Sequence, residues 1–297
     1  MAKELMGIIP PIVTPLTKDQ EVDYTSLRNL TNWVIEHGVH GVLTLGGAGE
    51  IMMFTESERN QIAKTVIDEA NGRVPVLVGT SHYSTNAAIK MSRDAKDLGA
   101  DALVLIEPWG GAATDVLEYY KRINDAVDIS LCLYTHFMSV DLVKKCAALS
   151  NLRYVKEGNV SMNHCMQLVK ELGKNRVFAG STAMMFRQMV LGLQGAVMGE
   201  NEVWPESAVE LFNFIRAGDL EKARRVYFEK HLPLVEFCSL GGGAASVSWH
   251  TQTIKAALVA RGIIENDIIR GPQQQIDEIT KRELVLWLAS KGLTSKK

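Results

Sequence analysis

Strand-like and helix-like segments alternate along the first two thirds of the sequence, and this alternation constrains the fold more than any other feature. Each short apolar, β-rich run is followed by a stretch with apolar residues at helical spacing. Strands are predicted at residues 7–13, 41–45, 74–78, 102–106, 130–134, 152–156, 177–178 and 195–198. Short connections between such units favour parallel strands, and eight of them close into a ring. The expected fold class is therefore α/β, a (β/α)8 TIM barrel.

After residue 204 the pattern changes to helices alone. Amphipathic helices are predicted at residues 205–216, 220–236, 247–261 and 275–289. Their apolar faces need a partner surface, and the composition does not shift towards that of an independent module. We therefore expect a catalytic barrel over residues 1–204 and a C-terminal helical domain, packed on it as an appendage, over residues 205–297.

Length, composition and charge narrow the class of partner. A chain of 297 residues suits one α/β barrel, and a hydrophobic fraction of 46% supplies a large core. The net charge of −2, with both signs interspersed, gives no electrostatic footprint for nucleic acid or for an anionic membrane. We expect a small-molecule partner, with no nucleic acid and no membrane.

Cysteine spacing and the N-terminus indicate the compartment. The four cysteines show neither paired spacing nor zinc-ligand spacing, so buried thiols in a reducing compartment are expected, with no metal site. The N-terminus has no charged stretch followed by an apolar run and a cleavage site, and no uninterrupted apolar segment is long enough to span a membrane. The expected location is cytoplasmic.

Residues 152–158 contain the strongest candidate for a reacting group. They read Leu-Arg-Tyr-Val-Lys-Glu-Gly, a β-rich run that ends on Lys156 and breaks at Gly158. A lysine at the end of a buried strand loses solvation of its charged form, so its pKa falls and a neutral amine becomes available. Such an amine can attack a ketone and form a Schiff base. The alternative is a solvated lysine beside a surface turn.

Other polar residues follow other predicted strands at the same end. Four of these strands end at or shortly before Tyr134, Glu107, His82 and the glycine-rich loop 46–50. In a barrel of this kind the catalytic groups project from the carboxyl ends of the strands, so these residues and Lys156 should meet at one site. Each alone has a structural alternative: a core tyrosine, a carboxylate approaching a helix, a loop histidine and a tight turn.

Several motifs together resemble a known enzyme family. They are residues 7–15, 46–50, 72–76, 98–101 and 155–157, with Tyr134, Gly180 and the Lys-Ala-Ala-Leu run at 255–258. On these motifs the chain resembles, over nearly its whole length, the class I aldolase family that includes dihydrodipicolinate synthase and N-acetylneuraminate lyase. The resemblance implies a barrel with a C-terminal helical domain, no cofactor, and assembly as a homo-oligomer, commonly a tetramer.

The resemblance also implies roles for individual residues. Lys156 would form a Schiff base with a 2-keto acid, and Tyr134 would relay protons. The loop of Gly46, Gly47, Ala48 and Gly49, which ends at Glu50, would hold the substrate carboxylate. Gly180 and Glu200 belong to the expected substrate-binding set. Independently of the resemblance, the positions of His82, Glu107 and Glu200 near the ends of the third, fourth and eighth predicted strands make them, in that order, candidates for a second proton carrier.

Departures from the family pattern reduce the number of family reactions that we expect this chain to catalyse. Gly47 and Ala48 stand where members usually carry Ser or Thr, so the hydroxyls are missing while backbone N–H donors remain. The loop 135–138 reads Thr-His-Phe-Met and lacks the usual arginine, so synthesis of dihydrodipicolinate is not expected. Thr182 and Ala183 replace the acidic pair of the sialic acid lyases.

One short stretch points to a subgroup of the family. Residues 80–85, Thr-Ser-His-Tyr-Ser-Thr, are similar to a stretch in the 2-keto-3-deoxy-sugar-acid dehydratases. The expected function is therefore a Schiff-base lyase that eliminates water from such an acid or releases pyruvate from it. Trp109, Phe137 and Trp204 would shape the pocket. A non-catalytic relative that binds a keto acid as a sensor or regulator is an alternative, and a flavin- or phosphate-binding barrel is a weaker one.

Overall fold

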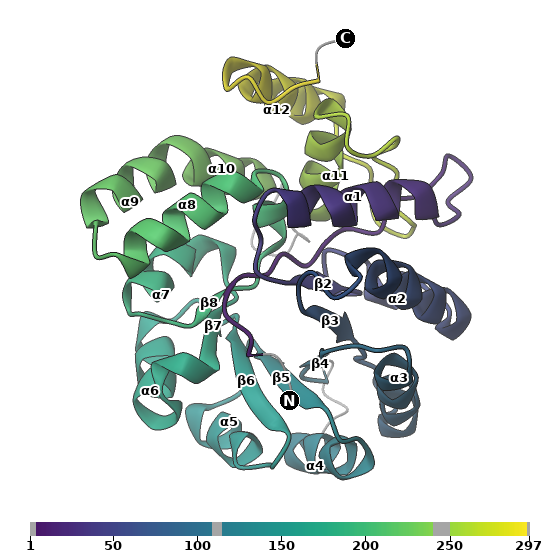
Figure 1. Cartoon of the computed structure of the whole chain (residues 1–297), viewed down its shortest axis with the longest axis vertical. Helices are drawn as coiled ribbons and strands as arrows, with labels where there is room; N and C mark the ends of the chain where they lie inside the picture. Colours follow the sequence, from purple (N-terminus) through teal and green to yellow (C-terminus); the bar gives the residue numbers. More distant parts are fainter. Residues whose placement is uncertain (1–3, 109–114, 240–249, 296–297) are drawn as a thin grey trace.

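Eight parallel strands form a single ring-like sheet at the centre of the protein. The structure is a computed structural model that describes residues 4–108, 115–239 and 250–295 (Figure 1). The strands are β1 Gly7–Ile8, β2 Val42–Thr44, β3 Val76–Gly79, β4 Ala102–Ile106, β5 Ser130–Thr135, β6 Leu152–Glu157, β7 Val177–Ala179 and β8 Gly195–Ala196. Neighbouring strands follow the order β1-β8-β7-β6-β5-β4-β3-β2, and all pairs are parallel. The predicted (β/α)8 TIM barrel with C-terminal helices is confirmed.

The ring closes between its first two strands through a short bridge. The predicted strand at 7–13 divides: Gly7 and Ile8 pair with β8, whereas Pro11 forms a parallel bridge to Leu43 in β2. The backbone N–H of Ile12 donates to the Leu43 carbonyl at 2.9 Å. A continuous ladder is interrupted here because Pro10 and Pro11 have no N–H to donate.

Helices surround the strands on the outside of the ring (Figure 1). They are α1 Tyr24–Glu36, α2 Glu56–Ala70, α3 Thr85–Asp97, α4 Val116–Ala126, α5 Val140–Ala147, α6 Met162–Leu172, α7 Met185–Val190 and α8 Pro205–Arg216. Their first turns show the local signals expected from the sequence. Thr55 and Glu58 form a reciprocal capping box at the start of α2, and Asp23 caps α1 through the Ser26 N–H.

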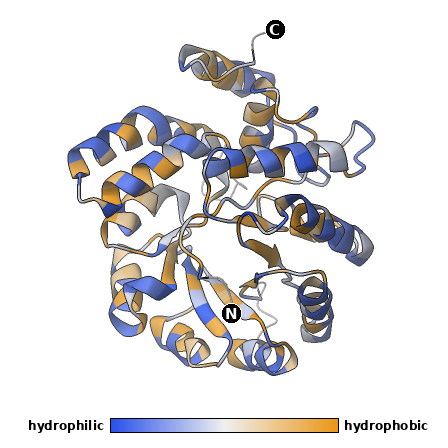
Figure 2. Cartoon of the chain, viewed as in Figure 1, coloured by the Kyte–Doolittle hydropathy of each residue, from blue (hydrophilic) through white to orange (hydrophobic). Residues whose placement is uncertain are grey.

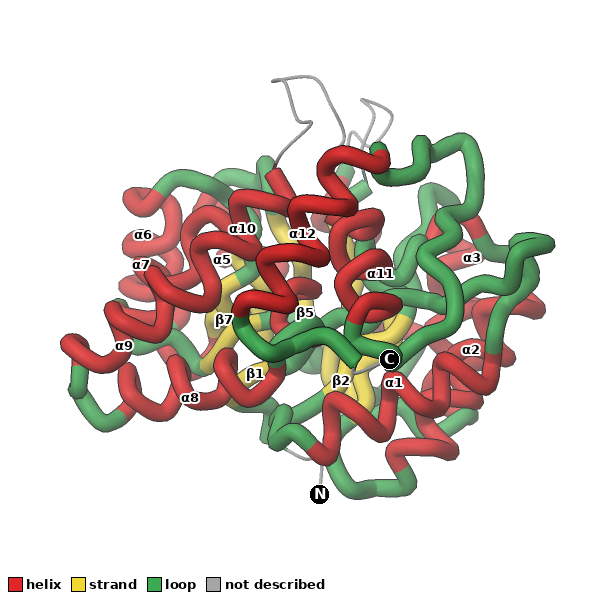
Figure 3. The backbone as a smooth tube through the Cα atoms, turned by 90° about the horizontal axis from the view of Figure 1, so that it is seen from above, coloured by secondary structure: helices red, strands yellow, loops and turns green. Residues whose placement is uncertain are grey.

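The remaining helices form the C-terminal part of the chain. They are α9 Leu220–Val226, α10 Leu232–Ser239, α11 His250–Ala260 and α12 Glu278–Ser290, with a π-helix, Tyr227–His231, between α9 and α10. α11 packs against both α10 and α12, whereas α8 contacts β1. Figure 3 shows the helices around the enclosed strands. In the described part of the chain, no helix has both the length and the apolar character to cross a membrane.

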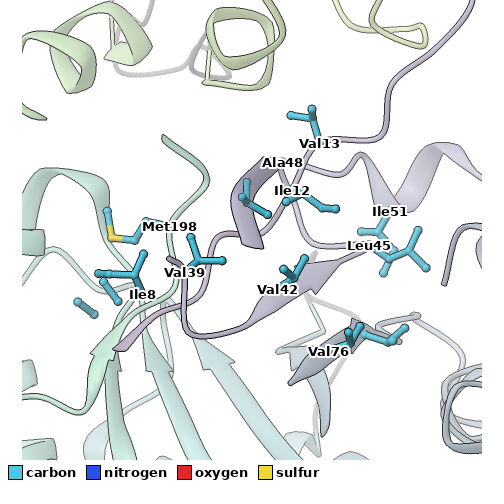
Figure 4. Packing of buried hydrophobic residues seen from close by; sticks show 14 of the residues in the cluster. Ile8, Ile12, Val13, Val39, Val42, Leu45, Ala48, Ile51, Val76 and Met198 are labelled. Carbon is cyan, nitrogen blue, oxygen red and sulfur yellow. The ribbon is translucent and has the colours of Figure 1, made fainter. Parts of the chain in front are cut away.

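Apolar side chains pack on both sides of the strands. The larger cluster lies between strands and helices, and Figure 4 shows part of it, including Ile8, Val42 and Met198. Figure 2 shows hydrophobic stretches along the strands and mixed character on the helices. A second cluster, including Leu43, Phe178 and partly buried Tyr154, consists of side chains that point into the ring. The interior of the ring is thus packed with apolar side chains from several strands.

Candidate active site

Lys156 and Tyr134 lie side by side at the carboxyl ends of β6 and β5. The two residues are register partners, as are Cys132 and Tyr154 two residues earlier. Alternate residues of a strand share a face, and Cys132 and Tyr154 belong to the interior cluster. Both side chains therefore point into the ring, where the Lys156 Nζ lies 3.7 Å from the centroid of the Tyr134 ring.

Burial changes the protonation of both groups. Lys156 is 6% exposed, and this burial lowers its pKa from 10.5 to about 8, against the opposing effect of the Cys132 and Glu200 charges. At pH 7 about one lysine in ten then carries a neutral amine, compared with about one in three thousand at the ordinary value. Burial, followed by the charges of Glu200 and Glu107, raises the pKa of Tyr134, so its hydroxyl stays protonated.

Two glycines provide the space that these side chains occupy. A Cβ at Gly180 would lie 2.6 Å from the Lys156 Cγ and 3.0 Å from the Glu157 carbonyl oxygen. A Cβ at Gly158 would lie 2.7 Å from the Tyr134 ring. Gly180 was expected in the substrate-binding set; the structure places it against the aliphatic stem of Lys156, where its lack of a side chain leaves room for the lysine.

A cavity of about 190 Å³ opens over the lysine. It is smaller than the roughly 300–1,000 Å³ pockets of drug-sized ligands, so it suits a small molecule. Six of the predicted site residues line it: Gly46, Gly47, His82, Glu107, Tyr134 and Lys156. Much of the remaining wall is apolar and includes Leu45, Ile51, Met52, Ile106 and Pro108. The structure therefore brings together residues from several strand ends, as the sequence predicts.

The glycine-rich loop after β2 contributes Gly46 and Gly47 to the lining of this cavity. Leu45 and Glu50 both have φ of 56°, which turns the chain sharply at each end of the loop. Within residues 4–108, 115–239 and 250–295, the N–H groups of Gly46 and Gly47 donate to no protein acceptor. Ala48 and Gly49 do not line the cavity, and Ala48 is packed near Gly199. The part of the loop available to an anion is thus its first half.

His82 lines the cavity, and one of its two ring nitrogens is hydrogen-bonded within the protein. Its Nδ1 accepts a hydrogen bond from the Ser84 N–H at 2.9 Å. That bond makes Nδ1 the acceptor, so the proton of a neutral ring lies on Nε2. The side chain is half-buried.

Glu107 lines the same cavity, but its carboxylate is occupied by the loop after β5. One oxygen accepts from the N–H groups of His136 and Phe137, at 2.8 and 2.7 Å. The other accepts from the Met138 N–H at 3.2 Å and from the Thr135 hydroxyl at 3.3 Å. With both oxygens engaged, Glu107 is well placed to fix this loop and poorly placed to transfer a proton.

Glu200 lies buried beyond β8, outside the cavity lining, with a partner that the sequence did not reveal. One oxygen accepts from the Thr182 hydroxyl at 3.3 Å and lies 3.2 Å from the His250 Nε2. The other has no partner among the described residues. His250 begins α11 as described and carries no motif in the sequence, so only the tertiary structure identifies this pair.

Glu50 connects the glycine-rich loop to the C-terminal helices. Its carboxylate is buried, pairs with the equally buried Lys255 of α11, and accepts from the Arg270 N–H at 2.9 Å. Lys255 also donates to the Ile268 carbonyl at 2.8 Å. The Lys-Ala-Ala-Leu motif at 255–258, noticed in the sequence without a role, thus supplies the cation that holds this loop.

Two of the three aromatic residues expected to shape the pocket do not line it. Phe137 is 84% exposed, and Trp204 packs near Trp287 with ring centroids 6.5 Å apart; neither lines the cavity. Trp109 lies outside the described residues. Among those that are described, no group of three or more His, Cys, Asp or Glu side chains could hold a metal ion.

Comparison with known proteins agrees with this geometry. The model of the dihydrodipicolinate synthetase family matches residues 4–291. The 4-hydroxy-tetrahydrodipicolinate synthase of Methanocaldococcus jannaschii is 30% identical over 239 residues, which cover 77% of this chain and 82% of that protein.

Solved structures extend the similarity to the whole fold. Dihydrodipicolinate synthase from Aquifex aeolicus superposes with a TM-score of 0.90 at 26% identity, covering 99% of this chain and all of the other. YagE, a prophage protein from E. coli K12 solved with pyruvate, superposes with a TM-score of 0.87 at 28% identity, covering 97% and 99%.

Proposed function

Because the chain belongs to the dihydrodipicolinate synthetase family, we propose that it is a class I lyase that forms a Schiff base between Lys156 and a 2-keto acid. The observation that carries this proposal is the buried amine, with a pKa lowered to about 8, at the base of a cavity beside Tyr134. A neutral amine in such a place is a nucleophile for a ketone.

The first chemical step joins Lys156 to the substrate. Its nitrogen adds to the C2 carbonyl, the carbonyl oxygen takes up protons and leaves as water, and an iminium remains. The protonated Tyr134 hydroxyl, next to the lysine, can supply and recover a proton during this exchange. The N–H groups of Gly46 and Gly47 would receive the substrate carboxylate.

The iminium then takes up the electrons of a breaking bond. In retro-aldol cleavage a base removes the C4 hydroxyl proton, the C3–C4 bond breaks, an aldehyde leaves, and the enamine is protonated at C3 and hydrolysed to pyruvate. In dehydration a base removes a C3 proton, and the resulting enamine expels the C4 hydroxyl, which leaves as water with an added proton. Tyr134 can serve either route.

His82 is the best placed of the candidates for the second proton carrier. It lines the cavity and its Nε2 has no hydrogen-bond partner among the described residues, whereas both oxygens of Glu107 are bound by a loop. Glu200 lies beyond the cavity lining and is paired with His250, so it would act on the site through its charge.

The proposed substrate class is a 2-keto-3-deoxy sugar acid. The stretch at 80–85 supports it, and the absence of hydroxyls at Gly47 and Ala48 argues against synthesis of dihydrodipicolinate, even though several relatives are named for that reaction. The YagE structure contains pyruvate, the product expected from aldol cleavage. We further propose a cytoplasmic homotetramer.

Borohydride trapping tests the proposal directly. Incubation with pyruvate and sodium borohydride should add a reduced pyruvate adduct at Lys156, found by peptide mass mapping, and Lys156→Arg should abolish it. Screening 2-keto-3-deoxy acids for release of pyruvate or of a 2-oxo semialdehyde then separates aldolase from dehydratase.

A non-catalytic keto-acid sensor is the alternative function, since so many polar groups of the family are missing. The sensor would bind a 2-keto acid reversibly in calorimetry and give no adduct with any of them. An adduct on Lys156 without turnover of any 2-keto-3-deoxy acid would leave Schiff-base formation established and the lyase proposal refuted.

A further inference from the structure

Three consecutive glutamines in the C-terminal segment 268–275 have three different environments. Gln275 bonds back to Ile269, accepting from its N–H at 3.1 Å and donating to its carbonyl at 2.9 Å. Gln274 is exposed. Gln273 is half-buried and lines the cavity over Lys156, although it is more than a hundred residues further along the chain. Of the three glutamines, Gln273 is therefore the one that lines the cavity.

The segment that carries Gln273 is held firmly against the barrel. Arg270 donates to Glu58 at 2.7 Å and to the Met53 carbonyl at 3.1 Å, and its guanidinium lies 4.5 Å from the centroid of the Phe54 ring. Its backbone N–H also binds Glu50, as described above. These contacts fix the start of the segment, and the two bonds between Gln275 and Ile269 close it into a loop. Gln273 therefore has a defined position over the cavity.

The amide of Gln273 is available for a ligand. Within the described residues it has no hydrogen-bond partner, whereas the neighbouring cavity wall is largely apolar, with Met52, Met53, Ile106 and Pro108. An amide offers both a donor and an acceptor, which match the hydroxyls of a substrate tail. A ligand that forms a hydrogen bond with such a partly buried, unpaired amide should bind more tightly than one that does not.

We propose that Gln273 contacts the substrate and recognises a hydroxyl in the tail of the 2-keto acid, beyond the atoms that react. This inference rests on the proposed function and assigns to the C-terminal segment 268–275 a part in specificity. The barrel would bind the keto-acid end of the substrate, and a residue of the C-terminal segment would hydrogen-bond to its hydroxylated tail.

The test compares two keto acids of equal chain length by borohydride trapping on Lys156. The probes are 2-ketopentanoate, which has no hydroxyl, and the 2-keto-3-deoxypentonates, which carry two. Gln273→Leu keeps the volume and removes both hydrogen-bonding groups, while Gln274→Leu is the matched control in the exposed neighbour. The measured quantity is the concentration of each acid that gives half-maximal initial trapping.

Gln273→Leu should raise the half-saturating concentration of the 2-keto-3-deoxypentonates by about 3- to 10-fold, as expected for one neutral hydrogen bond. It should leave 2-ketopentanoate unchanged, and Gln274→Leu should change neither. Equal effects on both acids, or no effect on either, would overturn the inference while leaving Schiff-base formation intact. A parent protein that traps no keto acid would overturn the proposed function and this inference with it.

Discussion

Gly180→Ala should slow the reaction of Lys156 without replacing any titratable side chain. Carbon atoms in ordinary contact are about 3.5–4.0 Å apart, so a methyl group 2.6 Å from the lysine Cγ is about 1 Å too close. The same methyl group would lie 3.0 Å from the Glu157 carbonyl oxygen and 3.1 Å from its carbon, which belong to the backbone of β6 and cannot easily move. The lysine stem must therefore shift by about 1 Å.

A displacement of this size should change the stability of the fold little and the rate of the reaction strongly. Overpacking of this kind costs about 1–3 kcal/mol of unfolding free energy, which the fold should survive. A reacting atom misplaced by about 1 Å can lose about 100-fold in rate. We therefore expect a folded variant in which adduct formation with pyruvate is slower by about two orders of magnitude.

The assay follows the initial rate of the borohydride-trapped pyruvate adduct by intact mass, near the Lys156 pKa of about 8. Urea unfolding is measured in parallel, with Gly47→Ala as the stability control, because a Cβ there meets nothing within 4 Å. The free energy of unfolding of this control should differ from that of the parent by less than about 1 kcal/mol. If the initial trapping rate of Gly180→Ala is within about 3-fold of the parent rate, the position of the lysine stem does not limit the reaction and the prediction is wrong.

Three further predictions concern the same site. Adduct formation should rise with pH and level off above about 8, because only the neutral form of Lys156 reacts; a rate that still climbs steeply near the ordinary value of 10.5 would contradict the lowered pKa. Tyr134→Phe should keep some adduct with pyruvate but lower turnover by about 10²- to 10⁴-fold, measured as product release; unchanged turnover would remove Tyr134 from proton transfer. Lys255→Met should lower the free energy of unfolding by about 3–5 kcal/mol in urea, since Glu50 is left buried without its cation; a loss below about 1 kcal/mol would show that Arg270 and water suffice.

The architecture could be predicted from the sequence because its signals are local. Apolar runs and helical spacing recur at short range, and the carboxyl ends of parallel strands necessarily meet at one side of a ring. This geometry is why Lys156, Tyr134, His82 and Glu107 were expected at one site, and the structure does bring them around one cavity. Their catalytic roles stay predictions.

Other features depend on contacts between distant parts of the chain. Nothing near Gln273 or His250 in the sequence distinguishes them from other residues of the C-terminal segments. Only the packing of those segments brings Gln273 to the cavity and His250 to Glu200. Sequence periodicity also does not predict that Gly180 packs against the lysine stem. Nor does it predict that N–H groups of the loop after β5 bind the Glu107 carboxylate. Such features are set by distances between atoms, which a one-dimensional pattern does not contain.

The pair between Glu50 and Lys255 joins positions 205 residues apart in the sequence. Replacing either partner alone by a neutral residue would leave a buried charge without its counter-ion, so the barrel loop and helix α11 depend on each other. A chimaera that combined this barrel with the tail of a relative would need a donor with a cation in the same place.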